Sequence, residues 1–283
     1  MSTRKAVNAP RRFRPTHKPK LGQNFLVDAV AARRIVEALG DIQEDVVVEI
    51  GPGRGALTRL LAERAGRLIA IEFDRTLAER LRADFAGREN VEIVSADILR
   101  MQLGELLAAC TSAGKKVAKL VGNIPYYITS DILLWLFAQH ECISLAVLMM
   151  QKEVADRLVA EPGSRDYGLL SVTTRLFADP ERLFTLAPGA FSPAPQVHSS
   201  VLRLRTAPKA HELHVDADDF LNFCRLAFAH KRKTLFNNLR RKYSEEQIRR
   251  ALRKLEIRED VRAEALSLEN LARVFGDTQH RSQ

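Results

Sequence analysis

The chain has 283 residues, of which 46% are hydrophobic and 28% are charged, a composition typical of a soluble globular protein with one large core and a smaller second domain. No apolar run approaches the roughly 20 residues of a membrane span, and the basic N-terminus lacks the apolar segment of a signal peptide. Three scattered cysteines without ligand spacing argue against a structural metal or a disulfide framework, and they favour a reducing, cytoplasmic compartment.

The positive charge is unevenly distributed. Lysine and arginine together number 44 against 35 aspartates and glutamates, a formal net charge of +9. Two segments, 1–20 and 230–242, contain several basic residues and no acid. Two separated basic clusters are the electrostatic signature of a polyanion partner, so the sequence favours a nucleic acid.

The first half of the chain alternates apolar strands with amphipathic helices. Strands are predicted at 46–50, 67–72, 91–94, 117–121 and 143–150. Helices are predicted at 56–64, 76–85, 103–110, 128–138 and 152–159. Because repeated strand–helix units with nearly continuous apolar strands form parallel sheets covered on both faces, we predict a doubly wound, Rossmann-like α/β domain.

After Tyr167 this alternation weakens. The pattern predicts a helix at 169–177, extended segments at 182–186 and 199–205, and between these an irregular, proline-dense loop at 188–195. From about Asp216 onward only helices are predicted, at 220–229, 234–240, 245–255 and 268–275. We therefore predict a basic tail (1–17), an α/β domain (18–208) and a small helical domain (209–283).

A glycine-rich turn, residues 51–55, joins the first predicted strand to its helix. Glycine lets the backbone approach a ligand closely. Residues 51–56 also fit the dinucleotide pattern G-x-G-x-x-A, so a nicotinamide or flavin site is one interpretation. Against it, Pro52 makes the turn rigid and Glu49 places an acid where a diphosphate would bind.

Two further acids are predicted at the same edge of the sheet. Glu72 ends the second strand, and Asp97 follows the third. A carboxylate at Glu72 can accept hydrogen bonds from both hydroxyls of a ribose, and Asp97 can accept one from the amino group of an adenine. Together with the glycine turn, these acids indicate S-adenosylmethionine as the cofactor.

The segment Asn-Ile-Pro-Tyr, residues 123–126, follows the fourth predicted strand. The Asn123 side-chain oxygen and the Ile124 carbonyl can each accept a hydrogen bond from one exocyclic amine. Pro125 fixes the backbone, and Tyr126 offers a ring on which a flat base can stack. This pattern resembles the Asn-Pro-Pro-Tyr box of amino-methyltransferases, although an ordinary turn containing proline remains the alternative.

From Lys18 to Phe275 the chain resembles the rRNA adenine N6-dimethyltransferases, in particular the bacterial KsgA type that modifies 16S rRNA. The motifs that carry this resemblance lie at 21–26 (Leu-Gly-Gln-Asn-Phe-Leu), 49–55, 96–97, 123–126 and 191–201. Without the resemblance, Gln23 and Asn24 would be interpreted as a loop before a helix capped by Asp28.

The resemblance implies roles for individual residues. Asn24 and the Leu26 backbone would contact the methionine end of S-adenosylmethionine, with the other cofactor contacts at Gly51, Gly53, Glu72, Asp97, Ile98 and Asn123. Phe191 would be a second aromatic wall that sandwiches a flipped adenine against Tyr126. The rRNA backbone would be held by Lys231, Arg232, Lys233, Arg240 and Arg241.

The expected reaction is the dimethylation of adenine N6 at two adjacent adenines in a hairpin loop near the 3′ end of 16S rRNA. The resemblance implies a monomer without metal that acts on a 30S assembly particle. Gln196 stands where relatives commonly carry lysine, which removes one charge near the target loop. The alternatives are a 23S rRNA methyltransferase of the erythromycin-resistance type and a non-catalytic RNA-binding assembly factor on the same fold.

Overall fold

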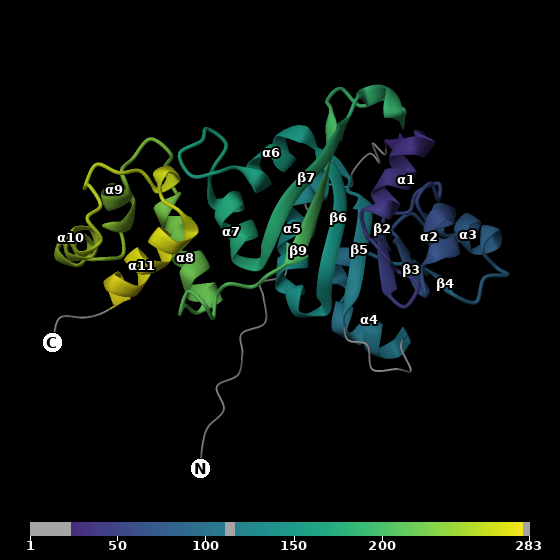
Figure 1. The fold of residues 1–283 in the computed structure, drawn as a ribbon, viewed down its shortest axis with the longest axis horizontal. Coiled ribbons are helices and arrows are strands. Elements are labelled where there is room, and N and C mark those ends of the chain that lie inside the picture. The colour runs from purple at the N-terminus through teal and green to yellow at the C-terminus, as the bar shows by residue number, and fades with distance from the viewer. Residues whose placement is uncertain (1–23, 111–116, 280–283) are drawn as a thin grey trace, which may run out of the picture.

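The computed structural model describes residues 24–110 and 117–279, so the predicted basic tail and the first residues of the 21–26 motif lie outside the described part. A seven-stranded sheet of order β4-β3-β2-β5-β6-β9-β7 forms the centre (Figure 1). The strands are β1 Phe25–Leu26, β2 Val46–Ile50, β3 Arg67–Glu72, β4 Val91–Ser95, β5 Ala118–Asn123, β6 Ile143–Gln151, β7 Ala178–Leu186, β8 Phe191–Ser192 and β9 Ser199–Thr206. The α-helices are α1 Ala29–Glu37, α2 Thr58–Arg64, α3 Arg75–Asp84, α4 Leu103–Cys110, α5 Thr129–Ala138, α6 Lys152–Val159, α7 Leu169–Phe177, α8 Ala217–Ala227, α9 Leu235–Leu239, α10 Glu245–Lys254 and α11 Leu268–Gln279.

The sheet is mostly parallel, as predicted. Strands β4, β3, β2, β5 and β6 pair in parallel, and β9 and β7 continue the sheet in the antiparallel sense. Side chains alternate between its faces, so that Val47 packs in one apolar cluster with α1 and α2, while Val46 and Val48 pack in the other with α4 and α5. Helices therefore cover both faces, which explains why β2 is buried throughout.

The strand order reverses at β2. Strand β3 lies on one side of it, whereas β5 lies on the other, and at such a switch point the loops beyond the carboxyl ends diverge and leave a crevice for a ligand. A Cβ atom at Gly122 of β5 would lie only 2.7 Å from the Ile50 carbonyl oxygen, so the two strands approach closely here because position 122 is glycine. The switch point therefore brings the glycine turn and Asn123 to the same crevice.

The prediction of an irregular loop at 188–195 was wrong in part. Within it, a short 3-10 helix, Pro188–Ala190, is followed by β8, which pairs antiparallel with β1. Leu26 lies opposite Phe191 and Phe25 opposite Ser192. A two-residue strand uses few backbone N–H groups, and β8 ends at Ser192, directly before Pro193. A proline-dense sequence therefore does not exclude it.

Several predicted boundaries differ from those observed. Helix α2 begins at Thr58 rather than at 56, after the glycine turn, in which Gly55 has a φ of +78°. Helix α8 begins at Ala217 rather than at 220, where the Asp216 side chain caps it by accepting from the Asp219 N–H. Strand β7 begins at Ala178 rather than at 182, since it pairs with β9 along most of its length. The predicted cap of α1 is confirmed, because Asp28 accepts from the N–H groups of Val30 and Ala31.

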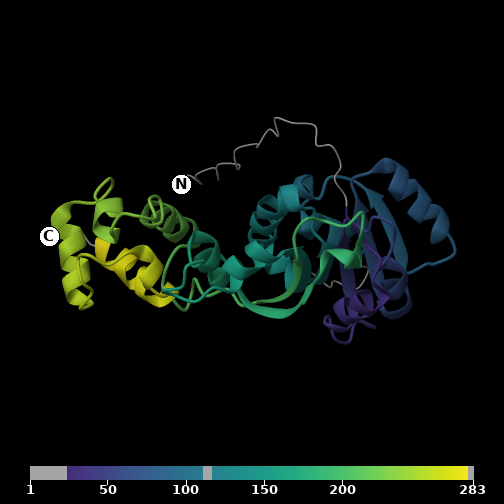
Figure 2. The ribbon, with the colours of Figure 1, turned by 90° about the horizontal axis from the view of Figure 1, so that it is seen from above.

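Helices α8–α11 form a lobe beside the sheet (Figures 1 and 2). One apolar cluster runs from the sheet through α7 into this lobe, where Phe220, Phe223 and Phe275 pack together. The change from sheet to helices near residue 208 is therefore not a break in packing. Among the described residues, no helix is both long and apolar enough to span a membrane.

Candidate active site

The glycine turn after β2 is built around the carboxylate of Glu72. Gly51 and Gly53 have positive φ angles of 65° and 59°, and the Gly53 N–H donates to Glu72 Oε2 at 2.9 Å. The Asp74 N–H donates to the other carboxylate oxygen, Oε1, at 2.9 Å. Burial raises the pKa of Glu72 above its ordinary value. Each oxygen keeps a second lone pair, so the carboxylate can still accept hydroxyl groups while it shapes the turn.

Glu49 is a second buried acid in this crevice. Its side chain is 1% exposed, and its Oε2 has no hydrogen-bond partner in the described chain. Burial raises its pKa to about 8. It lines a narrow cavity of about 30 Å³ together with Gly51, Gly53 and Asn123. An unpartnered buried acid favours a cationic ligand and opposes a diphosphate, which counts against the nicotinamide interpretation.

The β1 segment covers the crevice at the glycine turn. The Phe25 ring lies so close to the turn that a Cβ atom at Gly53 would be 3.0 Å from it. The Arg54 guanidinium stacks over the same ring, 4.3 Å from its centroid. The Asn24 carbonyl accepts from Asn123 Nδ2 at 2.9 Å, which connects β1 with the end of β5. The structure thus places Leu26 beside the glycine turn and joins Asn24 to Asn123. Their contact with the cofactor stays a prediction.

The third acid, Asp97, lies beyond β4. Its side chain accepts from the Leu99 N–H at 3.1 Å and is 3.4 Å from the Arg100 guanidinium, while Ile98 beside it is buried. Asp97 is partly exposed and caps the Ile98–Arg100 turn through Oδ1. Its Oδ2 faces Arg100 and keeps a lone pair that can accept a hydrogen bond from a ligand.

Two aromatic residues that the sequence interpretation missed flank these acids. Phe73, directly after Glu72, is 61% exposed, and Tyr127 is 48% exposed. The pKa of Tyr127 is raised by burial and then by the negative charges of Asp97 and Glu72. Phe73 directly follows Glu72, the acid at the end of a predicted strand, and this position could have identified Phe73 as a candidate site residue. Exposed rings at this position offer a flat ligand apolar surface.

The Asn-Ile-Pro-Tyr box is held rigidly at the end of β5. The Ile124 N–H donates to the Met149 carbonyl at 2.9 Å, and Ile124 is buried. Because Asn123 Nδ2 donates to Asn24, its Oδ1 is the amide atom left to accept a hydrogen bond. The Tyr126 hydroxyl lies 2.7 Å from Ser199 Oγ at the start of β9, which fixes the ring. The box therefore presents a fixed acceptor beside an oriented aromatic ring.

Phe191 occupies a different environment from the one predicted. It is 4% exposed and packs in the apolar cluster that contains Leu26, its partner across the β1–β8 ribbon. The structure places it on the segment adjoining the crevice, but its ring face is covered. A stacking role for Phe191 stays a prediction.

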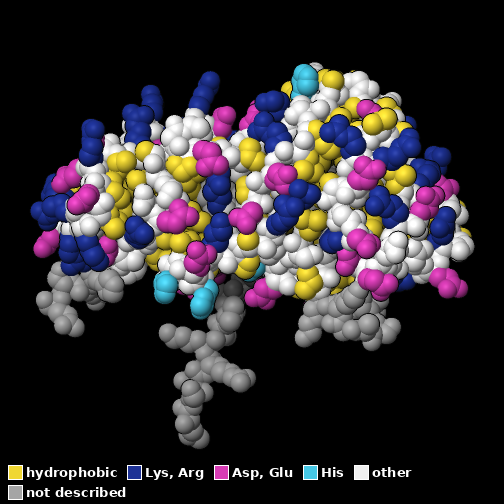
Figure 3. Space-filling model, in the orientation of Figure 1, with side chains coloured by type: hydrophobic (Ala, Val, Ile, Leu, Met, Phe, Trp, Pro, Cys, Tyr) yellow, Lys and Arg dark blue, Asp and Glu magenta, His cyan; other side chains and the backbone are white. Residues whose placement is uncertain are grey.

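The basic cluster, defined as Lys231, Arg232, Lys233, Arg240 and Arg241, lies in the helical lobe around α9. All five side chains are exposed. Lys231 Nζ donates to the Arg165 carbonyl at 2.8 Å, so this lysine also connects the lobe to the loop before α7. Figure 3 shows Lys and Arg side chains projecting from the upper edge of the lobe. The cluster is thus an exposed cationic surface separate from the crevice.

Comparison with known proteins gives matches over nearly the whole chain. The family model described as ribosomal RNA adenine dimethylase matches residues 14–279. The ribosomal RNA small subunit methyltransferase A of Koribacter versatilis is 53% identical over 95% of this chain and 97% of its own, and that of Acidobacterium capsulatum is 55% identical over 94% and 93%.

Two solved structures share the fold. The 23S rRNA methyltransferase ErmE is 28% identical with a TM-score of 0.69, covering 91% of this chain and all of its own. A dimethyladenosine transferase from Plasmodium falciparum, 24% identical, has a TM-score of 0.74 and covers 88% of this chain and 95% of its own. The glycine turn with its acids, the Asn-Ile-Pro-Tyr box and the match over nearly the whole chain lead to one conclusion: this protein belongs to the ribosomal RNA adenine dimethylase family.

Proposed function

We propose that this protein transfers methyl groups from S-adenosylmethionine to the N6 amines of two adjacent adenines in a hairpin loop near the 3′ end of 16S rRNA. It acts as a monomer in the cytoplasm on a 30S assembly particle. The observation that carries the proposal is the convergence, at the switch point of the sheet, of Asn123 with the glycine turn that Glu72 organises.

The crevice residues fit S-adenosylmethionine. Glu72 keeps lone pairs for the ribose hydroxyls, and Asp97 lies at the same edge for the adenine amino group. The unpartnered Glu49 oxygen favours the positive charge of the cofactor. The cofactor, when bound, supplies an electrophilic methyl group on a sulfonium. At Gly53 the Phe25 ring leaves no room for a side chain, so the turn offers its backbone to a ligand there.

The box positions the amine that accepts the methyl group. Asn123 Oδ1 and the Ile124 carbonyl accept hydrogen bonds from the N6 protons, which directs the nitrogen lone pair towards the methyl carbon. Tyr126, held by Ser199, supports the base by stacking. In the direct displacement, a carbon–nitrogen bond forms and the carbon–sulfur bond breaks. The positively charged amine then loses its proton to water, so no side-chain base is required.

The choice of 16S rRNA is supported by the level of identity. The relatives that are 53% and 55% identical carry the name of small-subunit methyltransferases, whereas the 23S rRNA enzyme is only 28% identical. The exposed basic cluster provides phosphate contacts that position the RNA without reading its sequence. The intact set of Glu72, Asp97 and Asn123 supports an enzyme rather than a non-catalytic binding protein.

The proposal is tested by incubating the protein with methyl-labelled S-adenosylmethionine and, separately, with undermethylated 30S particles and protein-free 23S rRNA. We expect N6-dimethyladenosine in the small-subunit hairpin and none in 23S rRNA. Asn123→Ala should lower the rate by about 100-fold or more, the scale on which one positioning hydrogen bond acts in a water-excluded site.

The matched control is Asn222→Ala on the exposed surface of α8, which should leave the rate unchanged. Label only in 23S rRNA would reassign the protein to the resistance group. Bound cofactor with no label in either RNA would leave a binding protein on a methyltransferase fold.

A further inference from the structure

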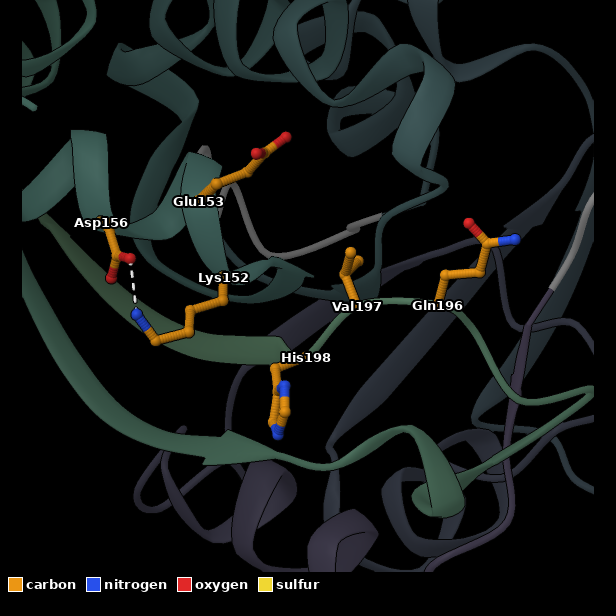
Figure 4. Close-up of a pocket in the computed structure, with 6 residues that line it drawn as sticks. All are labelled: Lys152, Glu153, Asp156, Gln196, Val197 and His198. Carbon is orange, nitrogen blue, oxygen red and sulfur yellow. Dashed lines mark hydrogen bonds and ion pairs between the residues drawn. The ribbon is translucent and has the colours of Figure 1, made fainter.

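A second, wider cavity of about 340 Å³ opens between the start of α6 and the segment before β9. Its volume lies within the range of small-ligand sites, about 300–1,000 Å³. Figure 4 shows its lining, which consists of Lys152, Glu153, Asp156, Gln196, Val197 and His198. None of these side chains has a part in the crevice described above.

The cavity adjoins the site of the target adenine through two connections. The Lys152 N–H donates to the His198 carbonyl at 2.9 Å, which joins the two walls of the cavity. Ser199, the next residue after His198, contacts the hydroxyl of Tyr126 at 2.7 Å. The cavity is therefore separated from the stacking ring by a single residue of β9, and one RNA strand can reach both.

The charges of the lining exclude a phosphate group as its ligand. Lys152 Nζ is 2.7 Å from the Asp156 carboxylate, which also pairs with Arg182. Counted together with Glu153, these two bases and two acids have no net charge. Glu153 is exposed and has no ion-pair partner within 24–110 and 117–279. With one lysine and two acids, the lining favours an uncharged ligand that carries N–H donors.

We propose that this cavity holds the nucleobase next to the target adenine, an amine-bearing base of the same RNA strand; the inference rests on the proposed function. The Gln196 amide both donates and accepts, which matches the edge of an adenine, and Glu153 accepts from an amino group. Val197, 42% exposed, offers an apolar contact for the ring. Of the two adjacent adenines, one then occupies the methylation site while the other occupies the cavity.

The test uses 30S particles reconstituted with 16S rRNA in which the neighbour of the target adenine is replaced by an abasic site. For the wild-type protein, we expect KM for the target adenine to rise by about ten-fold with kcat unchanged, because the lost contacts act in binding. The double variant Glu153→Gln with Gln196→Ala should show the raised KM on unmodified particles. It should show no further rise on the abasic particles.

Glu79→Gln, the same carboxyl-to-amide change on the exposed surface of α3, should behave as the wild type and show the full effect of the abasic site. The proposal is overturned if the abasic site leaves the wild-type KM unchanged, or if the double variant keeps the full rise. Thermal melting of the double variant checks that it is folded. Absence of any methylation of unmodified particles by the wild type would instead refute the proposed function.

Discussion

The crevice at the glycine turn and the wider cavity before β9 differ in how their acids are exposed. On the cofactor side, beyond β2 and β3, Glu49 and Glu72 are buried, and the cavity that Glu49 lines with the glycine turn measures about 30 Å³. On the RNA side, beyond β6 and before β9, the acids are exposed or paired and the cavity measures about 340 Å³. Buried acids without a cationic partner suit a small cation, whereas an open surface whose charges balance suits a flexible RNA strand. The site proposed for the cofactor and the site proposed for the RNA thus differ in the exposure of their acids.

The largest expected effect follows from Glu72→Gln, which sharpens the cofactor side of this comparison. An amide has one accepting oxygen, so it cannot hold both the Gly53 and Asp74 N–H groups and also bind ribose hydroxyls. We expect the affinity for S-adenosylmethionine to fall by about 100-fold, as for the loss of hydrogen bonds to a charged group. Isothermal titration calorimetry measures this, with Glu79→Gln as the matched control. An unchanged affinity would contradict the assignment.

Glu49→Gln tests whether burial of acid is what distinguishes the cofactor side. With a pKa of about 8, Glu49 is mostly protonated at pH 7, and a cationic ligand beside it lowers that pKa. Binding of S-adenosylmethionine at pH 7 should therefore release close to one proton in the wild type and much less in the variant. Calorimetry in two buffers of different ionisation enthalpy counts the protons. Equal release by both proteins would rule out this role.

The same substitution has a consequence for stability. The folded pKa of Glu49 lies above the ordinary value of 4.5, so its stabilising contribution is complete below pH 4.5 and is lost as the pH rises through 8. The wild type without ligand should lose roughly 3 kcal/mol of unfolding free energy relative to Glu49→Gln over this interval. Urea unfolding at pH 5 and pH 8 provides the comparison.

The smallest effect is expected from Lys233→Ala in the basic cluster of the helical lobe. This side chain is exposed, and one phosphate contact fewer should reduce the salt dependence of 30S binding by about one unit of slope. Cofactor affinity should not change. Lys254→Ala on α10, where the ammonium pairs with Asp277 at 2.6 Å, is the control. If Lys233→Ala altered cofactor binding, the two sides would not be independent.

Local patterns were enough to predict the parallel strands and the acids at their ends. The apolar runs of β2 and β3 and the position of Glu72 follow from the neighbours of each residue in the chain. The Asp28 cap is equally local. Such features need no knowledge of the rest of the fold, which is why the sequence was sufficient for them.

Features that depend on distant pairings could not be predicted. Strand β8 forms because Phe191 pairs with Leu26 of β1, and no local sequence pattern near Phe191 predicts that pairing. The burial of Phe191 and the exposure of Tyr127 have the same origin, since both depend on what packs against them. The cavity at Gln196 likewise arises from the approach of α6 to the segment before β9.

One continuous apolar core joins the sheet to helices α8–α11 and fixes the position of one against the other. Lys231 Nζ donates to the Arg165 carbonyl, and the Gly163 N–H donates to the Glu264 carbonyl. These two hydrogen bonds also connect the loop before α7 with the helical lobe. In the proposed function, the basic cluster contacts the RNA backbone and the Asn-Ile-Pro-Tyr box receives the base. The core then holds these two regions at one distance from each other. We therefore expect the protein to favour an RNA in which the backbone contact and the target base are separated by a matching distance.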